Sequence, residues 1–180
     1  MEQKVRFMNA DDIERSLNRI ATQIAENNHG VENLALIGIY TGGVSLAHRL
    51  QRIVQEREKV ALPTGSLDIT LYRDDWSLAS QNPVVKKTDI DFSLADRVVV
   101  LVDDVIYTGR TIRAALDALM DLGRPRCIQL AALIDRGGRE LPIQPDYTGM
   151  DIQVGDNEHV NVLLREHDGV DEVLLIQHNR

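Results

Sequence analysis

Residues 99–111 restrict the possible folds of this chain more than any other segment. An apolar strand, Val-Val-Leu-Val, ends in Asp103 and Asp104, and a Thr-Gly-Arg-Thr loop then opens a helix. Such a loop and helix N-terminus present backbone N–H groups to an anion such as a phosphate monoester. Two adjacent carboxylates suit the hydroxyl groups of a sugar phosphate and favour positive charge on a ribose ring. The segment therefore predicts a sugar-phosphate site at the end of a buried strand.

The candidate phosphate-binding residues follow the two acids directly. They are Val105, Ile106, Tyr107, Thr108, Gly109, Arg110 and Thr111. The two threonines offer hydroxyl groups, and the glycine lets the backbone approach a phosphate closely. A P-loop is excluded because no Gly-Lys-Ser/Thr follows. A solvated strand end or an ordinary helix cap would explain the acids or Thr111 singly, but not the combined pattern.

Hydrophobic periodicity predicts an α/β fold around this segment. A helix begins after Asn9 and ends before Gly30, with Ile13, Leu17, Ile20 and Ile24 on one face. Buried strands are predicted at 34–40, 67–72, 97–102 and 128–134, helices after Gly43 and from Thr111, and a hairpin from 160–164 and 173–176. Alternating strands and helices indicate a mostly parallel central sheet flanked by helices. Ligands bind beyond the carboxyl ends of such strands, so the polar loops at Thr41 and Asp103 mark the predicted site.

Length and composition fit one domain over residues 1–180. A hydrophobic content of 43% and a charged content of 27% exclude disorder of the whole chain. We expect a cytoplasmic protein with no membrane partner, because no apolar run suits a signal peptide or a membrane span. The single cysteine, Cys127, cannot form an internal disulfide, and its apolar surroundings favour a small core residue.

A net charge of −8 argues against nucleic-acid binding through an overall basic surface, but not against a local basic patch.

Residues 99–111 resemble the phosphoribosyl pyrophosphate (PRPP) motif of type I phosphoribosyltransferases. Residues 68–75, 121–125 and 135–143 are similar to one branch, the bifunctional pyrimidine operon attenuators and uracil phosphoribosyltransferases. The likeness covers nearly the whole chain. It implies the type I phosphoribosyltransferase fold with a small hood at about 135–165. It also implies a Mg²⁺-dependent reaction of uracil with PRPP that yields UMP and pyrophosphate, and regulation of pyrimidine genes through attenuator RNA.

The resemblance implies roles for individual residues. Asp103 and Asp104 would bind the ribose hydroxyls, steady an oxocarbenium-like transition state and meet Mg²⁺ indirectly through PRPP. Arg73 would lie on a flexible loop that closes over the pyrophosphate. The pyrophosphate loop would be Tyr40, Thr41, Gly42 and Gly43, with a cis peptide bond between the first two. Uracil would be bound by Ile134, Asp135, Arg136, Gly137 and Val160, largely through backbone groups.

Several of these residues have simpler explanations when taken alone. Thr41-Gly42-Gly43 is also typical of an ordinary strand-to-helix turn. Arg73 is also suited to an ion pair with Asp74 or Asp75, and Asp135-Arg136 to a structural salt bridge. Trp76, in the polar stretch 73–87, is expected to serve packing or a dimer contact, and we expect a homo-oligomer.

The chain departs from the family pattern in two places. Many relatives carry Arg where Gly42 stands, so weaker PRPP binding is expected. Basic residues expected for RNA contact are also partly missing, which leaves Arg15, Arg19 and Arg139 as candidates. From residue 146 onward there are eight acids and two arginines. Two alternative functions therefore stay open: an RNA-binding regulator that uses the site only as a nucleotide sensor, and a phosphoribosyltransferase for another base.

Overall fold

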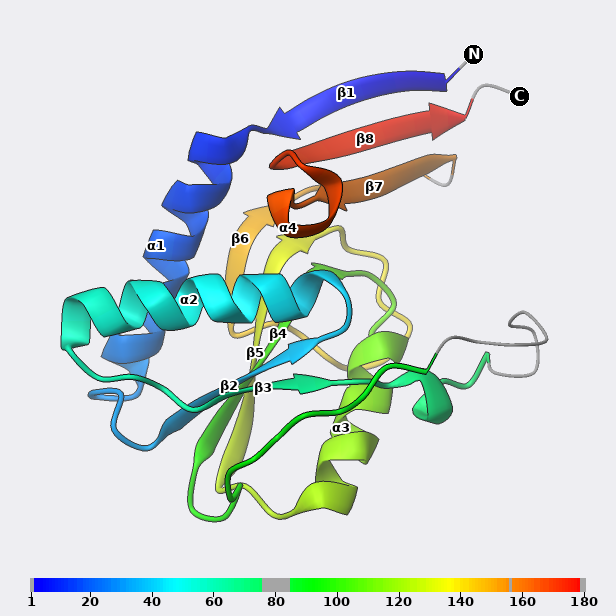
Figure 1. The fold of residues 1–180 in the computed structure, drawn as a ribbon. Coiled ribbons are helices and arrows are strands. Elements are labelled where there is room, and N and C mark those ends of the chain that lie inside the picture. Colours follow the sequence, from blue (N-terminus) through cyan, green and yellow to red (C-terminus); the bar gives the residue numbers. More distant parts are fainter. Residues whose placement is uncertain (1, 76–84, 156, 179–180) are drawn as a thin grey trace.

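The computed structural model describes residues 2–75, 85–155 and 157–178 and contains two sheets (Figure 1). The larger sheet is parallel throughout, in the strand order β3-β2-β4-β5-β6. Its members are β2 (Leu34–Ile39), β3 (Thr64–Leu67), β4 (Val98–Ile106), β5 (Cys127–Asp135) and β6 (Tyr147–Asp151). The predicted α/β class with a mostly parallel central sheet is confirmed.

Helices cover both faces of the larger sheet. They are α1 (Ala10–Asn27), α2 (Gly42–Glu58) and α3 (Arg110–Leu122). The first two pack on one face, and α3 packs on the other. Along β4, Val100 and Val102 face α1 and α2, whereas Val99 and Leu101 face α3. A strand buried on both faces needs a continuous apolar sequence, which explains the run before Asp103.

The first helix begins as its sequence indicates. The Asn9 side chain accepts a hydrogen bond from the Asp12 N–H, and the Asp12 carboxylate accepts one from the Asn9 N–H, both at 3.0 Å. This reciprocal capping box satisfies N–H groups that have no partner within the helix. The apolar face predicted from Ile13, Leu17 and their neighbours is buried.

The second sheet forms a hood over one end of the first (Figure 1). It is antiparallel, in the order β1-β8-β7, from β1 (Glu2–Met8), β7 (Glu158–Leu163) and β8 (Glu172–His178). The short helix α4 (Arg165–Asp168) joins β7 to β8. The predicted hairpin is therefore present, and the first and last described strands lie side by side.

Several sequence predictions need correction. The hood draws on β1, which was not predicted, whereas 147–151 of the predicted hood range belongs to the larger sheet as β6. The strand expected at 67–72 is divided between β3 and the 3₁₀ helix η1 (Thr70–Tyr72), because Ile69 leaves the extended conformation. Cys127 is exposed rather than buried, since it begins β5 at the sheet margin. Trp76 lies outside the described residues.

Among the described helices, none combines the length and apolarity needed to cross a bilayer.

Candidate active site

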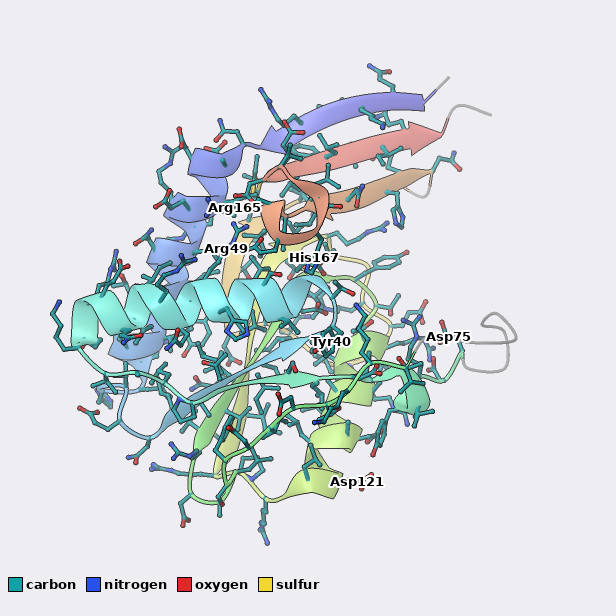
Figure 2. All side chains as sticks on the ribbon, in the orientation of Figure 1. Tyr40, Arg49, Asp75, Asp121, Arg165 and His167 are labelled. Atoms are coloured by element: carbon teal, nitrogen blue, oxygen red, sulfur yellow. The ribbon has the colours of Figure 1, made fainter. Side chains whose placement is uncertain are left out.

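Two neighbouring parallel strands bring the predicted loops together. Gly38 of β2 is paired with Val102 of β4, so the residues that follow each strand emerge at the same sheet edge. The peptide bond between Tyr40 and Thr41 is cis, as the resemblance led us to expect. Figure 2 shows Tyr40 at the end of β2.

One cavity at this edge brings the predicted catalytic residues together. It is lined by Tyr40, Thr41, Asp68, Ile69, Thr70, Arg73, Lys86, Asp103, Asp104, Val105 and Thr111. All three predicted catalytic residues are included, together with two residues each from the predicted pyrophosphate and phosphate sets. The arrangement places three carboxylates and two cations around one space.

Close packing explains why glycines follow Thr41. A Cβ on Gly43 would lie 2.2 Å from the Val102 carbonyl oxygen, and one on Gly42 would lie 2.4 Å from Asp104 Oδ2. The start of α2 therefore approaches the acid pair directly. Neither glycine provides a cation for the loop.

The acid pair is held by its own backbone. Asp103 is 6% exposed, and its Oδ1 accepts a hydrogen bond from the Asp104 N–H at 3.0 Å. Asp104 Oδ1 accepts one from the Val105 N–H at 2.8 Å. Burial, together with the charge of Asp104, raises the pKa of Asp103 well above its usual value. Burial likewise raises the pKa of Asp104. A cationic or hydroxyl-bearing ligand that enters the cavity therefore stabilises the charged form of this pair.

The predicted phosphate loop forms the turn between β4 and α3. Gly109 has φ +92°, a left-handed conformation that favours glycine. The carbonyl oxygen of Thr108 accepts hydrogen bonds from the N–H groups of Glu140 and Leu141, at 2.9 and 3.2 Å. Arg110 forms ion pairs with Asp74 at 2.5 Å and Glu140 at 2.6 Å. The loop is thus tied both to the segment that carries Arg73 and to the chain after β5.

Arg73 occupies its predicted position and also forms the ion pair that was the simpler explanation for it. It lines the cavity, and its guanidinium donates to both carboxylate oxygens of Asp75, at 2.8 and 2.6 Å. The polar stretch 73–87 that follows is described only at its ends, because 76–84 lie outside the described residues. In this conformation Asp75 is the partner of Arg73.

None of the five predicted base-binding residues lines the cavity, but Arg136 contacts the phosphate loop at Tyr107. The Arg136 guanidinium carbon stacks 3.7 Å from the centre of the Tyr107 ring. The Arg136 N–H donates to the Ile106 carbonyl at 3.1 Å, while its buried Nε has no hydrogen-bond partner within the described part of the chain. Ile134 and Val160 pack in one core cluster. Gly137 donates its N–H to Asp135 Oδ1 at 2.9 Å.

Arg139, a predicted RNA contact, is engaged within the protein. Its guanidinium donates to Asp135 Oδ2 at 2.6 Å and to the carbonyl oxygens of Tyr107 and Ile143, both at 2.8 Å. The side chain is only 11% exposed. The salt bridge predicted for the Asp135 segment therefore exists with Arg139 rather than Arg136. An RNA contact of Arg139 stays a prediction.

The other two RNA candidates lie on α1. Arg15 is 70% exposed on its side chain and pairs with Asp12 at 2.5 Å. Arg19 donates to the carbonyl oxygen of Gly149 at the neighbouring strand β6. Both are on the surface, and Arg15 is the freer of the two to meet a partner.

Sequence reasoning missed Asp68 and Lys86 as cavity residues. The Asp68 carboxylate accepts hydrogen bonds from the N–H groups of Thr70 at 2.9 Å and Lys86 at 2.5 Å. It therefore joins the turn at Thr70 to the far end of the 73–87 stretch. Asp68 could have been noticed within the segment that resembles the family, but Lys86 lies in an irregular stretch without periodicity.

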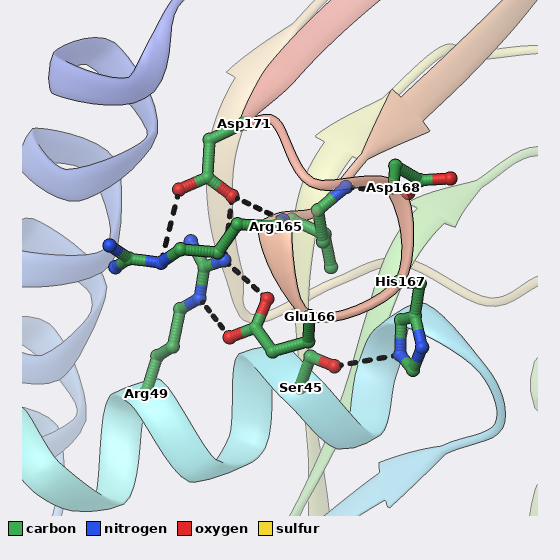
Figure 3. Close-up of polar contacts among 8 residues, drawn as sticks. Ser45, Arg49, Arg165, Glu166, His167, Asp168 and Asp171 are labelled. Carbon is green, nitrogen blue, oxygen red and sulfur yellow. Dashed lines mark hydrogen bonds and ion pairs between the residues drawn. The ribbon is translucent and has the colours of Figure 1, made fainter.

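A buried ion network fastens the hood to α2 (Figure 3). Arg49 is 6% exposed and donates to both oxygens of Glu166, at 2.8 and 2.5 Å, and to Asp171 at 2.6 Å. Nearby, Ser45 Oγ and His167 Nε2 are hydrogen-bonded at 3.0 Å. Ser45 lies in the first turn of α2, so this hydrogen bond joins the hood to the end of α2 that follows the pyrophosphate loop.

The comparisons with known proteins agree with this geometry. A model of the phosphoribosyl transferase domain matches residues 8–166. Bifunctional protein PyrR of Deinococcus deserti is 56% identical over 96% of this chain and 94% of its own, and that of Thermoanaerobacter sp. strain X514 is 53% identical over 98% and 99%. The fold is similar to that of the hypoxanthine phosphoribosyltransferase of Trypanosoma cruzi, with a TM-score of 0.72 at 18% identity over 97% of both chains. This chain therefore belongs to the phosphoribosyltransferase family and, within it, to the bifunctional PyrR proteins.

Proposed function

We propose that this chain transfers the phosphoribosyl group of PRPP to uracil, and that it couples this activity to regulation of pyrimidine genes. The observation that carries the proposal is the cavity that joins the buried Asp103–Asp104 pair to Thr41 and Arg73. The adjoining turn at Gly109 supplies the loop and helix N-terminus for the 5′-phosphate. Membership of the PyrR proteins supports uracil as the base.

The reaction follows from how these groups surround the substrate. N1 of uracil forms a bond with C1′ of PRPP, the bond from C1′ to the pyrophosphate oxygen breaks with its electrons going to pyrophosphate, and the N1 proton is released. The acid pair binds the ribose hydroxyls and stabilises the positive charge that develops on the ring. Positioning and charge stabilisation account for the rate, without a covalent enzyme intermediate.

The donor set fits a Mg²⁺ ion that arrives with PRPP. The described residues contain no group of three or more His, Cys, Asp or Glu side chains able to hold a metal by themselves. Mg²⁺ is commonly held by one or two carboxylates together with substrate phosphates and water. Asp103 and Asp104 would hold it indirectly, and the ion would neutralise charge on the pyrophosphate.

A panel of bases tests the substrate assignment. We expect wild-type protein with PRPP and Mg²⁺ to convert uracil, and to convert hypoxanthine, guanine or orotate at least about 10³-fold less efficiently, because buried polar groups of the pocket stay unpaired with the wrong base. Initial rates of nucleotide formation measure this. Faster turnover of a purine or orotate would replace uracil by that base. Binding of UMP without any turnover would favour the sensor alternative.

The regulatory part of the proposal concerns the α1 surface. We expect UMP-loaded protein to bind pyrimidine-operon leader RNA with a shallow salt dependence, because few basic residues are available for phosphate contact. Replacing Arg15 and Arg19 by Gln should reduce the slope of log affinity against log salt by about 0.7 for each lost phosphate contact. Titrations of labelled RNA at several salt concentrations measure the slope.

Arg113→Gln is the matched control for this experiment. Arg113 lies on α3, on the opposite face of the sheet, and forms a similar surface ion pair with Asp117 at 2.8 Å. An equal loss in the control and in the α1 variants would place RNA binding elsewhere than on α1.

A further inference from the structure

Lys86 reaches the pyrophosphate loop from the far end of the 73–87 stretch. Its Nζ donates a hydrogen bond to Thr41 Oγ1 at 3.0 Å and lies 5.0 Å from the centre of the Tyr40 ring. Its own N–H is held by Asp68 at 2.5 Å. All four residues line the cavity of the acid pair. The ammonium group is therefore anchored beside the loop by contacts from both its backbone and its side chain.

The pyrophosphate loop has no cation of its own. Gly42 stands where the family resemblance leads us to expect Arg. A side chain there would begin 2.4 Å from Asp104 Oδ2, so a cation at position 42 would have to displace the acid pair. Lys86 brings its charge to the same loop from the opposite direction without that conflict.

The other cation that lines the cavity, Arg73, and the neighbouring Arg110 are paired with carboxylates. Arg73 is held by Asp75 at 2.6 Å, and Arg110 by Asp74 and Glu140. Lys86 takes part in no ion pair with any carboxylate that the structure describes. An ammonium group has three N–H donors, and the bond to Thr41 uses one of them. Two donors are left for a ligand in the cavity.

We propose that Lys86 binds the pyrophosphate group of PRPP and thereby supplies the cation that Gly42 does not. The inference rests on the proposed phosphoribosyl transfer. Negative charge grows on pyrophosphate while its bond to C1′ breaks, and an ammonium group at Thr41 stabilises that charge. UMP has no pyrophosphate, so Lys86 contributes to binding of PRPP and pyrophosphate but not of UMP.

Three variants test the assignment. Lys86→Met keeps the length of the side chain but removes the charge, Lys86→Arg restores a cation, and Lys87→Met is the control at the adjacent exposed residue. For Lys86→Met we expect the KM for PRPP with Mg²⁺ and the dissociation constant of pyrophosphate with Mg²⁺ to rise by roughly tenfold to a hundredfold. The dissociation constant of UMP should stay within about twofold, because no charged contact is lost. Lys86→Arg should recover most of the loss.

Calorimetric titrations with pyrophosphate and UMP keep this test independent of turnover. Equal pyrophosphate affinity in Lys86→Met and Lys87→Met would overturn the assignment. A parallel loss of UMP affinity in Lys86→Met would also overturn it, since this would show that Lys86 only shapes the site. If wild-type protein bound pyrophosphate but did not convert uracil, the proposed reaction would fail, while the titrations would still decide the role of Lys86.

Discussion

Replacing Asp103 and Asp104 together by Asn should lower the rate of UMP formation by at least about 10²-fold to 10³-fold. The pair supplies the negative charge that faces the ribose ring, and the amide side chains remove it. Asn keeps an oxygen that can accept the hydrogen bonds from the N–H groups of Asp104 and Val105, so the fold should survive. Steady-state rates with labelled uracil, PRPP and Mg²⁺ measure the effect.

Asp91→Asn is the control for this double variant, because Asp91 is an exposed carboxylate before β4. It should retain wild-type turnover. Near-normal turnover in Asp103→Asn/Asp104→Asn would contradict the assigned site.

The double Asn substitution should lower activity without lowering the stability of the fold. Because the pKa of Asp103 and that of Asp104 are raised on folding, the folded protein binds more protons than the unfolded chain between the ordinary carboxyl pKa and the raised values. The contribution of the pair to the free energy of unfolding therefore falls as pH rises through that window. The double Asn variant lacks this decrease, so it should be at least as stable as wild type at neutral pH in urea unfolding. A clear loss of stability would show that the carboxylates have a structural role.

The second large effect is expected from Arg49→Met. Removing a buried arginine leaves Glu166 without its cation and Asp171 with only the longer contact to Arg165 at 3.4 Å. Breaking such a network costs about 3 to 5 kcal/mol. The Glu166 side chain is 35% exposed, which places the expected loss near 3 kcal/mol, or a decrease in Tm of about 10 °C. Thermal unfolding followed by circular dichroism measures it. Arg52→Met, an exposed arginine one turn further along α2, should change Tm by at most about 2 °C.

The pH dependence identifies the cause of that loss. The hydrogen bond from Arg49 lowers the pKa of Glu166. Burial opposes the same effect at Asp171, but the Arg49 hydrogen bond still leaves the pKa of Asp171 lowered. A lowered pKa gives stability that is present above the ordinary carboxyl pKa and is lost as pH falls through the folded value. The difference in stability between wild type and Arg49→Met should therefore shrink below about pH 4. A difference that is constant with pH would indicate lost packing instead of lost charge pairing.

The positions of the acid pair and of Thr41 were predictable from the sequence, because each follows directly after a buried strand. The apolar run predicts a strand buried on both faces, and such a strand puts Asp103 and Asp104 at the sheet edge. The Thr-Gly-Arg-Thr loop comes soon after them in the sequence and therefore lies near the same edge. Thr41 was placed because it ends the neighbouring strand. These predictions needed only strand burial and the rule that ligands bind at the carboxyl ends of parallel strands.

Other features depend on contacts between distant segments, which periodicity does not encode. The hood strand β1 is polar and exposed for most of its length, and it is specified by pairing with β8 more than 160 positions away. Lys86 is 45 positions from Thr41, and Arg49 is more than 115 positions from both of its carboxylate partners. The contact of Arg139 with the Tyr107 carbonyl oxygen likewise joins residues 32 positions apart.

The central claim is most directly tested by incubating the wild-type chain with labelled uracil, PRPP and Mg²⁺ and counting both products. We predict one UMP and one pyrophosphate for each uracil consumed, with the reaction abolished by chelation of Mg²⁺. Consumption of PRPP without UMP, or no reaction with uracil while another base is converted, would contradict it.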